Sequence, residues 1–290
     1  MFLDLKLENV VASSFAWNDD DIESYKARNK NIAIRLEEYL MNGNNLLDAS
    51  KIQQNVFPEV EVDVFISHSH NDKEQAIQIA LSLEAIGLKP FVDSCVWGYA
   101  DELLKKIDGE FCIPTGWEHY SYELRNRTTT NVHLILNTAL QQMIHNSELF
   151  IFLGTESSIK IDEYMTHAEQ LSSPWIFSEL MFARNVKRTE RKKLELMAAE
   201  SFRELNEAVG DSQPVEFRYL LPQSTYSMDH EQFIEWLRSC CQPDDSDDSK
   251  HSQPHYTDLI KRINGLQHVD KLYKELGVDK RLLESPRFRR

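Results

Sequence analysis

Trp175 and Glu179 stand four positions apart in a segment that the sequence predicts to be helical. Ser173 and Pro174 precede them, and a serine followed by a proline is typical of a helix start. Because residues four apart share a helix face, we expect the carboxylate to lie beside aromatic side chains. A fixed negative charge in such a place is suited to breaking an N-glycosidic bond, since it stabilises the cation that develops on the sugar. The competing interpretation is a surface glutamate that pairs with a nearby lysine or arginine.

A second group of polar side chains follows two predicted strands. Ser67 and His68 come at the end of the first strand, and Asp93 ends the second. Trp97 lies in the loop beyond Asp93, where it could equally stack on a ligand ring or plug the core. Phe65, inside the first strand, is better explained as a core residue than as a ligand contact.

The pair His68 and His70 forms an H-x-H pattern, which raises the question of a metal site. A protein metal site needs further ligands at compatible spacing, and the sequence offers none that we can identify. We therefore predict no metal site.

Strand-like and helix-like segments alternate along the chain. Short β-branched and aromatic runs predict strands over residues 62–67, 88–93, 149–153 and 215–221. Apolar periodicity and capping residues predict helices over residues 21–41, 71–86, 132–145, 173–205 and 229–240. This alternation predicts a mostly parallel sheet with helices on both faces, although no fifth strand is evident. Ligands of such sheets bind beyond the carboxyl ends of the strands.

The predicted segments divide the chain into four parts. Residues 1–58 are expected to form a helical N-terminal flank, and residues 60–241 the α/β domain. Residues 109–131 read as a polar, irregular insertion in that domain. An acidic linker follows over residues 242–254, and residues 255–290 are expected to form a helical C-terminal flank.

Charge and composition narrow the class of protein. The 290 residues carry a formal net charge of −15, which argues against nucleic acid or an anionic membrane as the main partner. The first residues lack a secretory signal, and the longest compact apolar run, residues 149–154, is too short to cross a bilayer. Four cysteines without a C-x-x-C pair indicate reduced thiols. We expect a soluble, cytoplasmic protein.

Several of these motifs occur together in one order. They are the run from Val64 to Asp72 (VFISHSHND), the Phe91-Val92-Asp93 strand end, the strand Leu149–Gly154 and the helix start Ser173–Leu180 (SPWIFSEL). This ordered set resembles the Toll/interleukin-1 receptor (TIR) family, particularly its bacterial members, over roughly residues 60–241. The resemblance implies a flavodoxin-like, five-stranded parallel sheet. It leaves open whether residues 101–107 or 132–145 form the helix between the second and third strands.

Many bacterial TIR domains cleave NAD at the nicotinamide–ribose bond, so the resemblance implies such an activity here. The products would be ADP-ribose, cyclic ADP-ribose or a related nucleotide signal, made in anti-phage defence and sensed by a downstream effector protein. NAD would be the substrate rather than a cofactor, and the protein would self-associate through TIR surfaces. Glu179 would be catalytic, and the implied substrate-binding residues are Phe65, Ser67, His68, Asp93, Trp97 and Trp175.

Two other functions stay open. Many animal TIR domains are non-catalytic adaptors that only assemble, and a TIR-like protein could also sense a nucleotide signal without making it. The chain has no G-x-G-x-x-G after a strand and no G-x-x-x-x-G-K-[ST]. A Rossmann dehydrogenase and a P-loop NTPase are therefore not supported.

Overall fold

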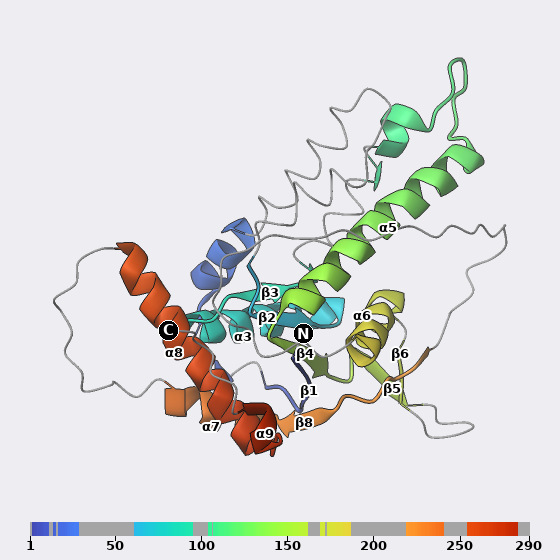
Figure 1. Cartoon of the computed structure of the whole chain (residues 1–290). Coiled ribbons are helices and arrows are strands. Elements are labelled where there is room, and N and C mark those ends of the chain that lie inside the picture. Colours follow the sequence, from blue (N-terminus) through green and yellow to red (C-terminus); the bar gives the residue numbers. More distant parts are fainter. Residues whose placement is uncertain are drawn as a thin grey trace.

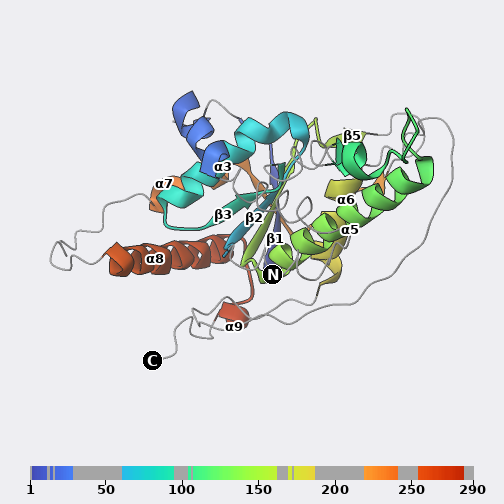
Figure 2. The ribbon, with the colours of Figure 1, turned by 90° about the horizontal axis from the view of Figure 1, so that it is seen from above.

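The computed structural model describes residues 2–11, 14–15, 17–28, 61–94, 104–105, 107–161, 169–171, 173–186, 219–240 and 254–283. Within these ranges a central five-stranded parallel sheet has helices on both faces, as Figures 1 and 2 show. The strands are β1 (Leu3–Glu8), β2 (Val64–Ser67), β3 (Pro90–Val92), β4 (Leu149–Gly154) and β8 (Tyr226–Asp229). The predicted α/β class is confirmed.

The helices are connected to the sheet in the alternating manner that the sequence predicts. They comprise the 3-10 turn η2 (His70–Asp72), α3 (Lys73–Ala85), α5 (Tyr122–Asn146), α6 (Pro174–Asn185), α7 (His230–Cys240), α8 (Pro254–Glu275) and α9 (Lys280–Leu283). Residues 19–28 are also helical. A second, antiparallel sheet contains β5 (Ile159–Ile161), β6 (Glu169–Leu171) and β7 (Tyr219–Leu220).

The order of strands across the main sheet is β3-β2-β4-β1-β8. A flavodoxin-like sheet has the order 2-1-3-4-5, and here its fourth position is filled by β1, the first strand of the chain. β1 runs parallel to β4 on one side and to β8 on the other. The expectation that residues 1–58 lie outside the sheet as a helical flank is therefore corrected for Leu3–Glu8.

One face of the sheet is packed against α3, α7 and α8. The three leucines of β1, Leu3, Leu5 and Leu7, are fully buried on this face. Helix α8 contributes Leu266, Val269, Leu272 and Tyr273, all fully buried, to the same core. The helical character predicted for residues 255–290 is confirmed over α8 and α9, and α8 covers the sheet.

Helix α8 approaches the turn after α3 closely. A Cβ on Gly265 would lie 2.8 Å from the backbone carbonyl carbon and oxygen of Gly87. Gly87 itself has a φ of 88°, a left-handed conformation that glycine adopts without strain. It follows the end of α3 at Ala85, where a glycine in this conformation is typical of a helix stop.

Helices α5 and α6 cover the opposite face, which carries a layer of aromatic side chains. Phe65 stacks on Phe150 with ring centroids 5.8 Å apart, and its ring also lies against Phe91. Phe152 is fully buried in the same cluster. In Figure 2 these two helices lie on the side of the sheet away from α3 and α8.

Helix α5 begins ten residues earlier than the sequence predicts, so residues 122–131 are helical rather than irregular. The side chain of Ser121 caps this helix by accepting a hydrogen bond from Leu124 N. The first ten residues are mostly exposed and lack the apolar stripe that marks a packed helix, which hid them from a periodicity argument. They form part of a projection from the body of the molecule (Figure 1).

Three further expectations change. The helix that begins at Pro174 ends at Asn185 instead of extending to residue 205. The predicted fourth strand is represented by β7, which pairs antiparallel with β6 in the small sheet. The missing fifth strand is β8, which lies at the edge of the main sheet next to β1. Residues 29–60 and 241–253, which include most of the predicted first helix and the linker, lie outside the described residues.

Candidate functional site

The chain crosses the sheet in opposite directions after β2 and after β4. From β2 it proceeds through α3 to the edge strand β3, whereas beyond β4 it passes through α6 and reaches the other edge strand, β8. β2 and β4 are neighbours, so the edge formed by their carboxyl ends is the topological switch point of the sheet. Three pairs of polar side chains meet at this edge.

The first pair joins β2 to α6. Ser67 Oγ donates a hydrogen bond to Glu179 Oε2 at 2.6 Å, and both residues are buried, Glu179 with 1 % exposure. Ser67 is the last residue of β2 and is in register with Phe152 on β4, so it faces α6. Ser173 caps α6 by accepting from Ile176 N, which sets the start of the helix and hence the position of Glu179. A carboxyl group held here has a fixed position, and its charge when ionised is poorly screened by water.

The second pair joins the residues after β2 and β3. His68 Nδ1 lies 2.6 Å from Asp93 Oδ1, and both side chains are almost fully buried. Asp93 Oδ1 also accepts a hydrogen bond from Ser94 N at 2.7 Å, which fixes the carboxylate. The contact is an ion pair whenever the imidazole is protonated. Asp93 thus sets the orientation of the ring directly after Ser67.

The third pair joins the segments that follow β2 and β4. Thr155 Oγ1, just after β4, donates to Asp72 Oδ2 at 2.5 Å. Ser158 Oγ donates to Leu153 O at 2.8 Å and accepts from Thr155 N, so the loop after β4 is closed on itself. Asp72 occupies the N-cap position of α3, but its side chain makes no cap hydrogen bond. Asp72 holds the loop after β4 instead.

The same edge of the sheet also carries a cation, Lys6, that the sequence did not identify as a site residue. Lys6 on β1 is in register with Phe152, which is in register with Ser67, so the three lie at one level on the same face. The Lys6 side chain is 13 % exposed, and its Nζ lies 2.9 Å from Glu8 Oε1. A Cβ on Gly154 would lie 2.7 Å from Lys6 Cε, so the lysine chain runs across this glycine. The alternation of leucines in β1 was the signal that could have placed Lys6 in the sheet.

The remaining predicted site residues are not brought together with these pairs. Phe65 is fully buried in the aromatic layer, as the core interpretation predicted. Trp175 is half-buried and packs edge-on against His133 of α5, with ring centroids 4.9 Å apart. Trp97 lies outside the described residues. Of the seven predicted site residues, the structure therefore joins Ser67 with Glu179 and His68 with Asp93.

No group of three or more His, Cys, Asp or Glu side chains in the described part of the chain is arranged to hold a metal ion. His70, the second histidine of the H-x-H pattern, is exposed on η2. Among the described helices, none combines the length and apolar character needed to cross a bilayer. Both described free cysteines, Cys112 and Cys240, are buried.

Comparison of the chain with protein-family models, with curated proteins and with solved structures found no match.

Proposed function

We propose that this chain is a TIR-type enzyme that cleaves NAD at the nicotinamide–ribose bond, with Glu179 as its catalytic residue. The observation that carries the proposal is the buried Ser67–Glu179 hydrogen bond of 2.6 Å at the switch point of the sheet. Dinucleotides are bound at this position in parallel α/β sheets. The order of sequence motifs that resembles TIR proteins supports the same assignment.

Cleavage of the nicotinamide–ribose bond requires mainly a negative charge held close to the ribose. The bond between ribose C1′ and the pyridinium nitrogen breaks, and its electron pair returns to the ring, so nicotinamide leaves as a neutral molecule. No general acid is required for this departure. The ribose becomes cation-like, and the Glu179 carboxylate stabilises it electrostatically. Ser67 acts as a positioning residue, because its hydroxyl fixes one carboxylate oxygen.

The fate of the cation decides the product. Attack by water gives ADP-ribose, attack by the adenine or a ribose hydroxyl gives a cyclic product, and another nucleophile gives an adduct.

Since Glu179 is 1 % exposed, the substrate reaches it only in a more open arrangement of the site. In this proposal the protein works in the cytoplasm, in anti-phage defence, with self-association and a downstream effector that senses the product. Nucleic acid and membranes are not partners.

The test is NAD loss and product identity, measured by chromatography at high protein concentration for the parent and for Glu179→Gln. The substitution keeps the size of the side chain and removes its charge. Glu148→Gln is the matched control, because Glu148 is equally buried, accepts a hydrogen bond from Tyr273 at 3.1 Å and precedes β4 at the opposite edge of the sheet. Melting curves establish that all three proteins are folded.

We expect the parent and Glu148→Gln to consume NAD and Glu179→Gln to lose at least about a hundredfold in rate, as removal of one preorganised electrostatic group does. A folded parent that never consumes NAD, even with crowding agents or infected-cell lysate, would refute the proposal that the chain is an enzyme.

The near-complete burial of Glu179 favours a second candidate, a non-catalytic TIR interaction module in which the Ser67–Glu179 pair is structural. Ligand-induced stabilisation without turnover would instead identify a nucleotide sensor.

A further inference from the structure

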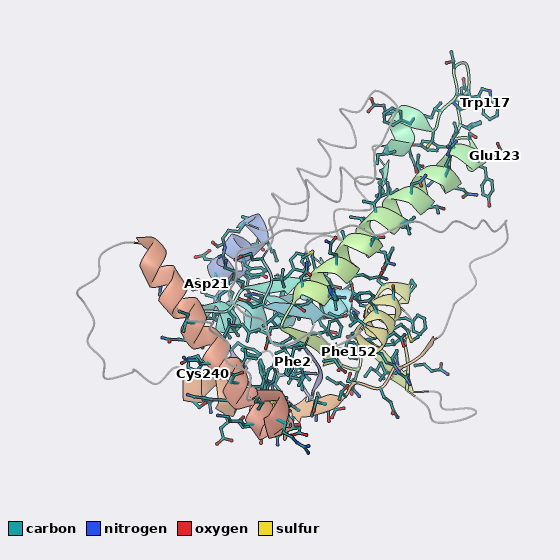
Figure 3. The ribbon with its side chains drawn as sticks, in the orientation of Figure 1. Phe2, Asp21, Trp117, Glu123, Phe152 and Cys240 are labelled. Carbon is teal, nitrogen blue, oxygen red and sulfur yellow. The ribbon has the colours of Figure 1, made fainter. Side chains whose placement is uncertain are left out.

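Exposed apolar side chains are concentrated at the projecting end of the molecule. Among the described residues seven large apolar side chains are exposed, and all but Val11 lie between residues 113 and 134. They are Ile113, Trp117, Tyr120, Tyr122, Leu124 and Leu134. Trp117 is 60 % exposed, and Figure 3 shows it with Glu123 at the far end of α5. We call residues 112–131 the tip.

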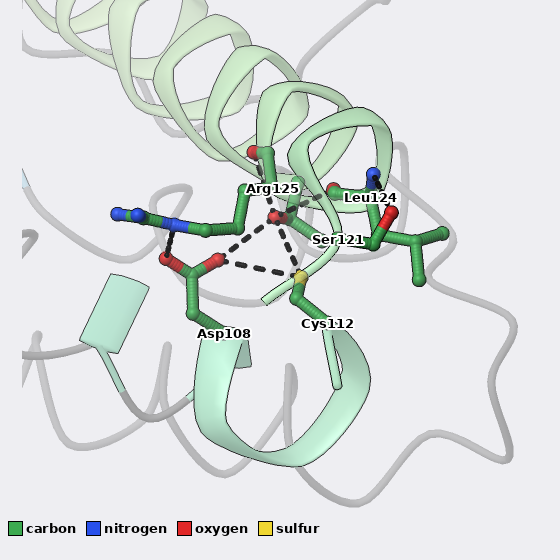
Figure 4. Close-up of polar contacts among 6 residues, drawn as sticks. Asp108, Cys112, Ser121, Leu124 and Arg125 are labelled. Carbon is green, nitrogen blue, oxygen red and sulfur yellow. Dashed lines mark hydrogen bonds and ion pairs between the residues drawn. The ribbon is translucent and has the colours of Figure 1, made fainter. Parts of the chain in front are cut away.

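The tip is held in shape by a compact polar network, drawn in Figure 4. Asp108 accepts hydrogen bonds from Arg125 Nε at 2.8 Å and from Thr128 Oγ1 at 3.1 Å. The buried Cys112 thiol lies 3.4 Å from Asp108 and 3.3 Å from Thr128. Ser121 N also donates to Cys112 O at 2.8 Å. The exposed aromatic rings are therefore presented on an ordered support.

The outward face of α5 carries an acid and a base that have no side-chain partner among the described residues. Glu123 and Arg127, four residues apart, are exposed, and neither side chain makes an ion pair or hydrogen bond with another described residue. Leu134 continues the same helix face, opposite the side that packs on the sheet. Because the acid and the base lie on one face, this face of α5 can be complementary to the same face of a second α5 helix that lies antiparallel to it.

We propose that the tip pairs with the tip of a second copy of this chain, with the two α5 helices antiparallel about a twofold axis at the level of residue 125. This axis places Glu123 opposite the partner's Arg127, and the reverse pair follows by symmetry. Leu134 lies nine residues, about 14 Å along the helix, from the axis. It therefore reaches the loop that carries the partner's Trp117. The assignment is independent of any activity at the Ser67–Glu179 site.

Charge explains why two such acidic chains would meet at this point. The whole chain carries −15, but residues 113–127 contain two acids, Glu118 and Glu123, and two bases, Arg125 and Arg127, so the net charge there is zero. The first ten residues of α5 extend about 15 Å before the helix becomes buried at Val132. That length exceeds the Debye length of about 8 Å at physiological salt, so the acidic bodies stay screened from each other.

The test is sedimentation velocity of the full chain over a range of concentrations, with charge-reversal variants. In a dimer of Glu123→Arg the new arginine faces the partner's Arg127, and in a dimer of Arg127→Glu the new glutamate faces the partner's Glu123, so each variant alone is repulsive. We expect each to weaken self-association at least about tenfold, since two attractive pairs become repulsive. An equimolar mixture of the two variants has both pairs attractive and should associate at least as well as the parent. The double variant Glu123→Arg/Arg127→Glu should also associate.

Trp117→Ala should weaken association without altering the circular dichroism spectrum, because the side chain is exposed. A parent that is monomeric at all concentrations would overturn the proposal, as would reversal variants that associate like the parent. So would a mixture that gains nothing over the separate variants. Trp117-dependent binding to neutral phosphatidylcholine vesicles by a monomeric protein would assign the tip to a membrane surface instead.

Discussion

Ser67 and Glu179 are 112 residues apart in the chain, yet the Ser67 hydroxyl donates to the Glu179 carboxylate at 2.6 Å. The contact exists because β2 ends and α6 begins at the same edge of the sheet, on the face that α5 and α6 cover. A carboxylate as buried as Glu179 is costly unless it has hydrogen-bond partners. The relationship therefore couples the stability of this edge to the position of the charge that the proposed reaction needs.

Removing the Ser67 hydroxyl tests its contribution to stability and its contribution to the position of the Glu179 carboxylate. We predict that Ser67→Ala lowers the free energy of unfolding by about 1–3 kcal/mol, because a buried charged acceptor loses a donor. In an active enzyme it should lower kcat more than it raises KM for NAD, since the carboxylate is no longer held. Ser67→Thr, which keeps a hydroxyl and suits a strand, should recover most of both losses. Thermal melts and steady-state kinetics measure them, and a Ser67→Ala protein as stable and active as the parent would contradict the positioning role.

Lys6 provides a test of where the phosphates of a dinucleotide lie. Its side chain crosses Gly154 at the carboxyl edge, at the same level of the sheet as Ser67. We predict that Lys6→Met raises KM for NAD about tenfold with kcat little changed, since the lost contact is made equally in the ground and transition states. Lys26→Met is the control, because Lys26 pairs with Glu23 on a helix outside this edge. Equal KM values for the two variants would exclude Lys6 from substrate binding.

The parts of the fold that the sequence predicted are those with strong local signals. β2 and β4 are short runs of β-branched and aromatic residues, buried on both faces, and they were placed nearly to the residue. Ser173 and Pro174 marked the start of α6, and hence the approach of Glu179 to the sheet. Because carboxyl ends of parallel strands meet at one edge, grouping Ser67, His68 and Asp93 followed from the strand assignment alone.

The parts that were missed depend on long-range packing. β1 alternates leucines with Asp4, Lys6 and Glu8, a pattern typical of a half-buried strand, and nothing local places it between β4 and β8. The exposed start of α5 has no apolar stripe, and its helical form rests on the Ser121 cap and on the contacts of Asp108. Trp175 shares a short helix with Glu179, but the sequence could not tell that its ring packs against His133 on α5.

The buried His230 predicts how stability depends on pH. Burial lowers the pKa of His230 below its ordinary 6.5, although the nearby Asp229 and Glu231 act in the opposite direction. The unfolded chain therefore binds protons that the folded chain rejects, so stability is lost as pH falls below about 6.5, by at most about 1.4 kcal/mol per pH unit and proton. The contribution of Glu275 to the pH dependence of stability has the opposite sign. Burial and Glu235 raise the pKa of this carboxyl group, so the folded chain holds a proton that the unfolded chain releases.

Denaturant unfolding at pH 7.5, 6.5 and 5.5 measures this dependence. His230→Leu should flatten the curve between pH 6.5 and 5.5, since it removes one of the protons that only the unfolded state takes up. Its matched control is His70→Leu, because His70 is exposed on η2. A His230→Leu curve as steep as that of the parent would mean that His230 protonates equally in both states.

The Cys112 thiol reports on the integrity of the tip. Burial raises its pKa above 9.0, and the neighbouring Asp108 raises it further, whereas Thr128 and Arg125 lower it. Since the thiolate is the reactive form, we predict that Cys112 in the folded protein is alkylated by iodoacetamide far more slowly than in the unfolded chain. Asp108→Ala removes the acceptor of Arg125 and Thr128 and also one cause of the raised Cys112 pKa, so it should open the tip and favour the thiolate, and both changes speed this labelling. Mass spectrometry of the labelled peptides measures each site separately. Cys240, buried on α7, is the internal control and should label at the same rate in both proteins. If Asp108→Ala left the Cys112 rate unchanged, or sped both sites alike, the polar network would not be what holds the tip.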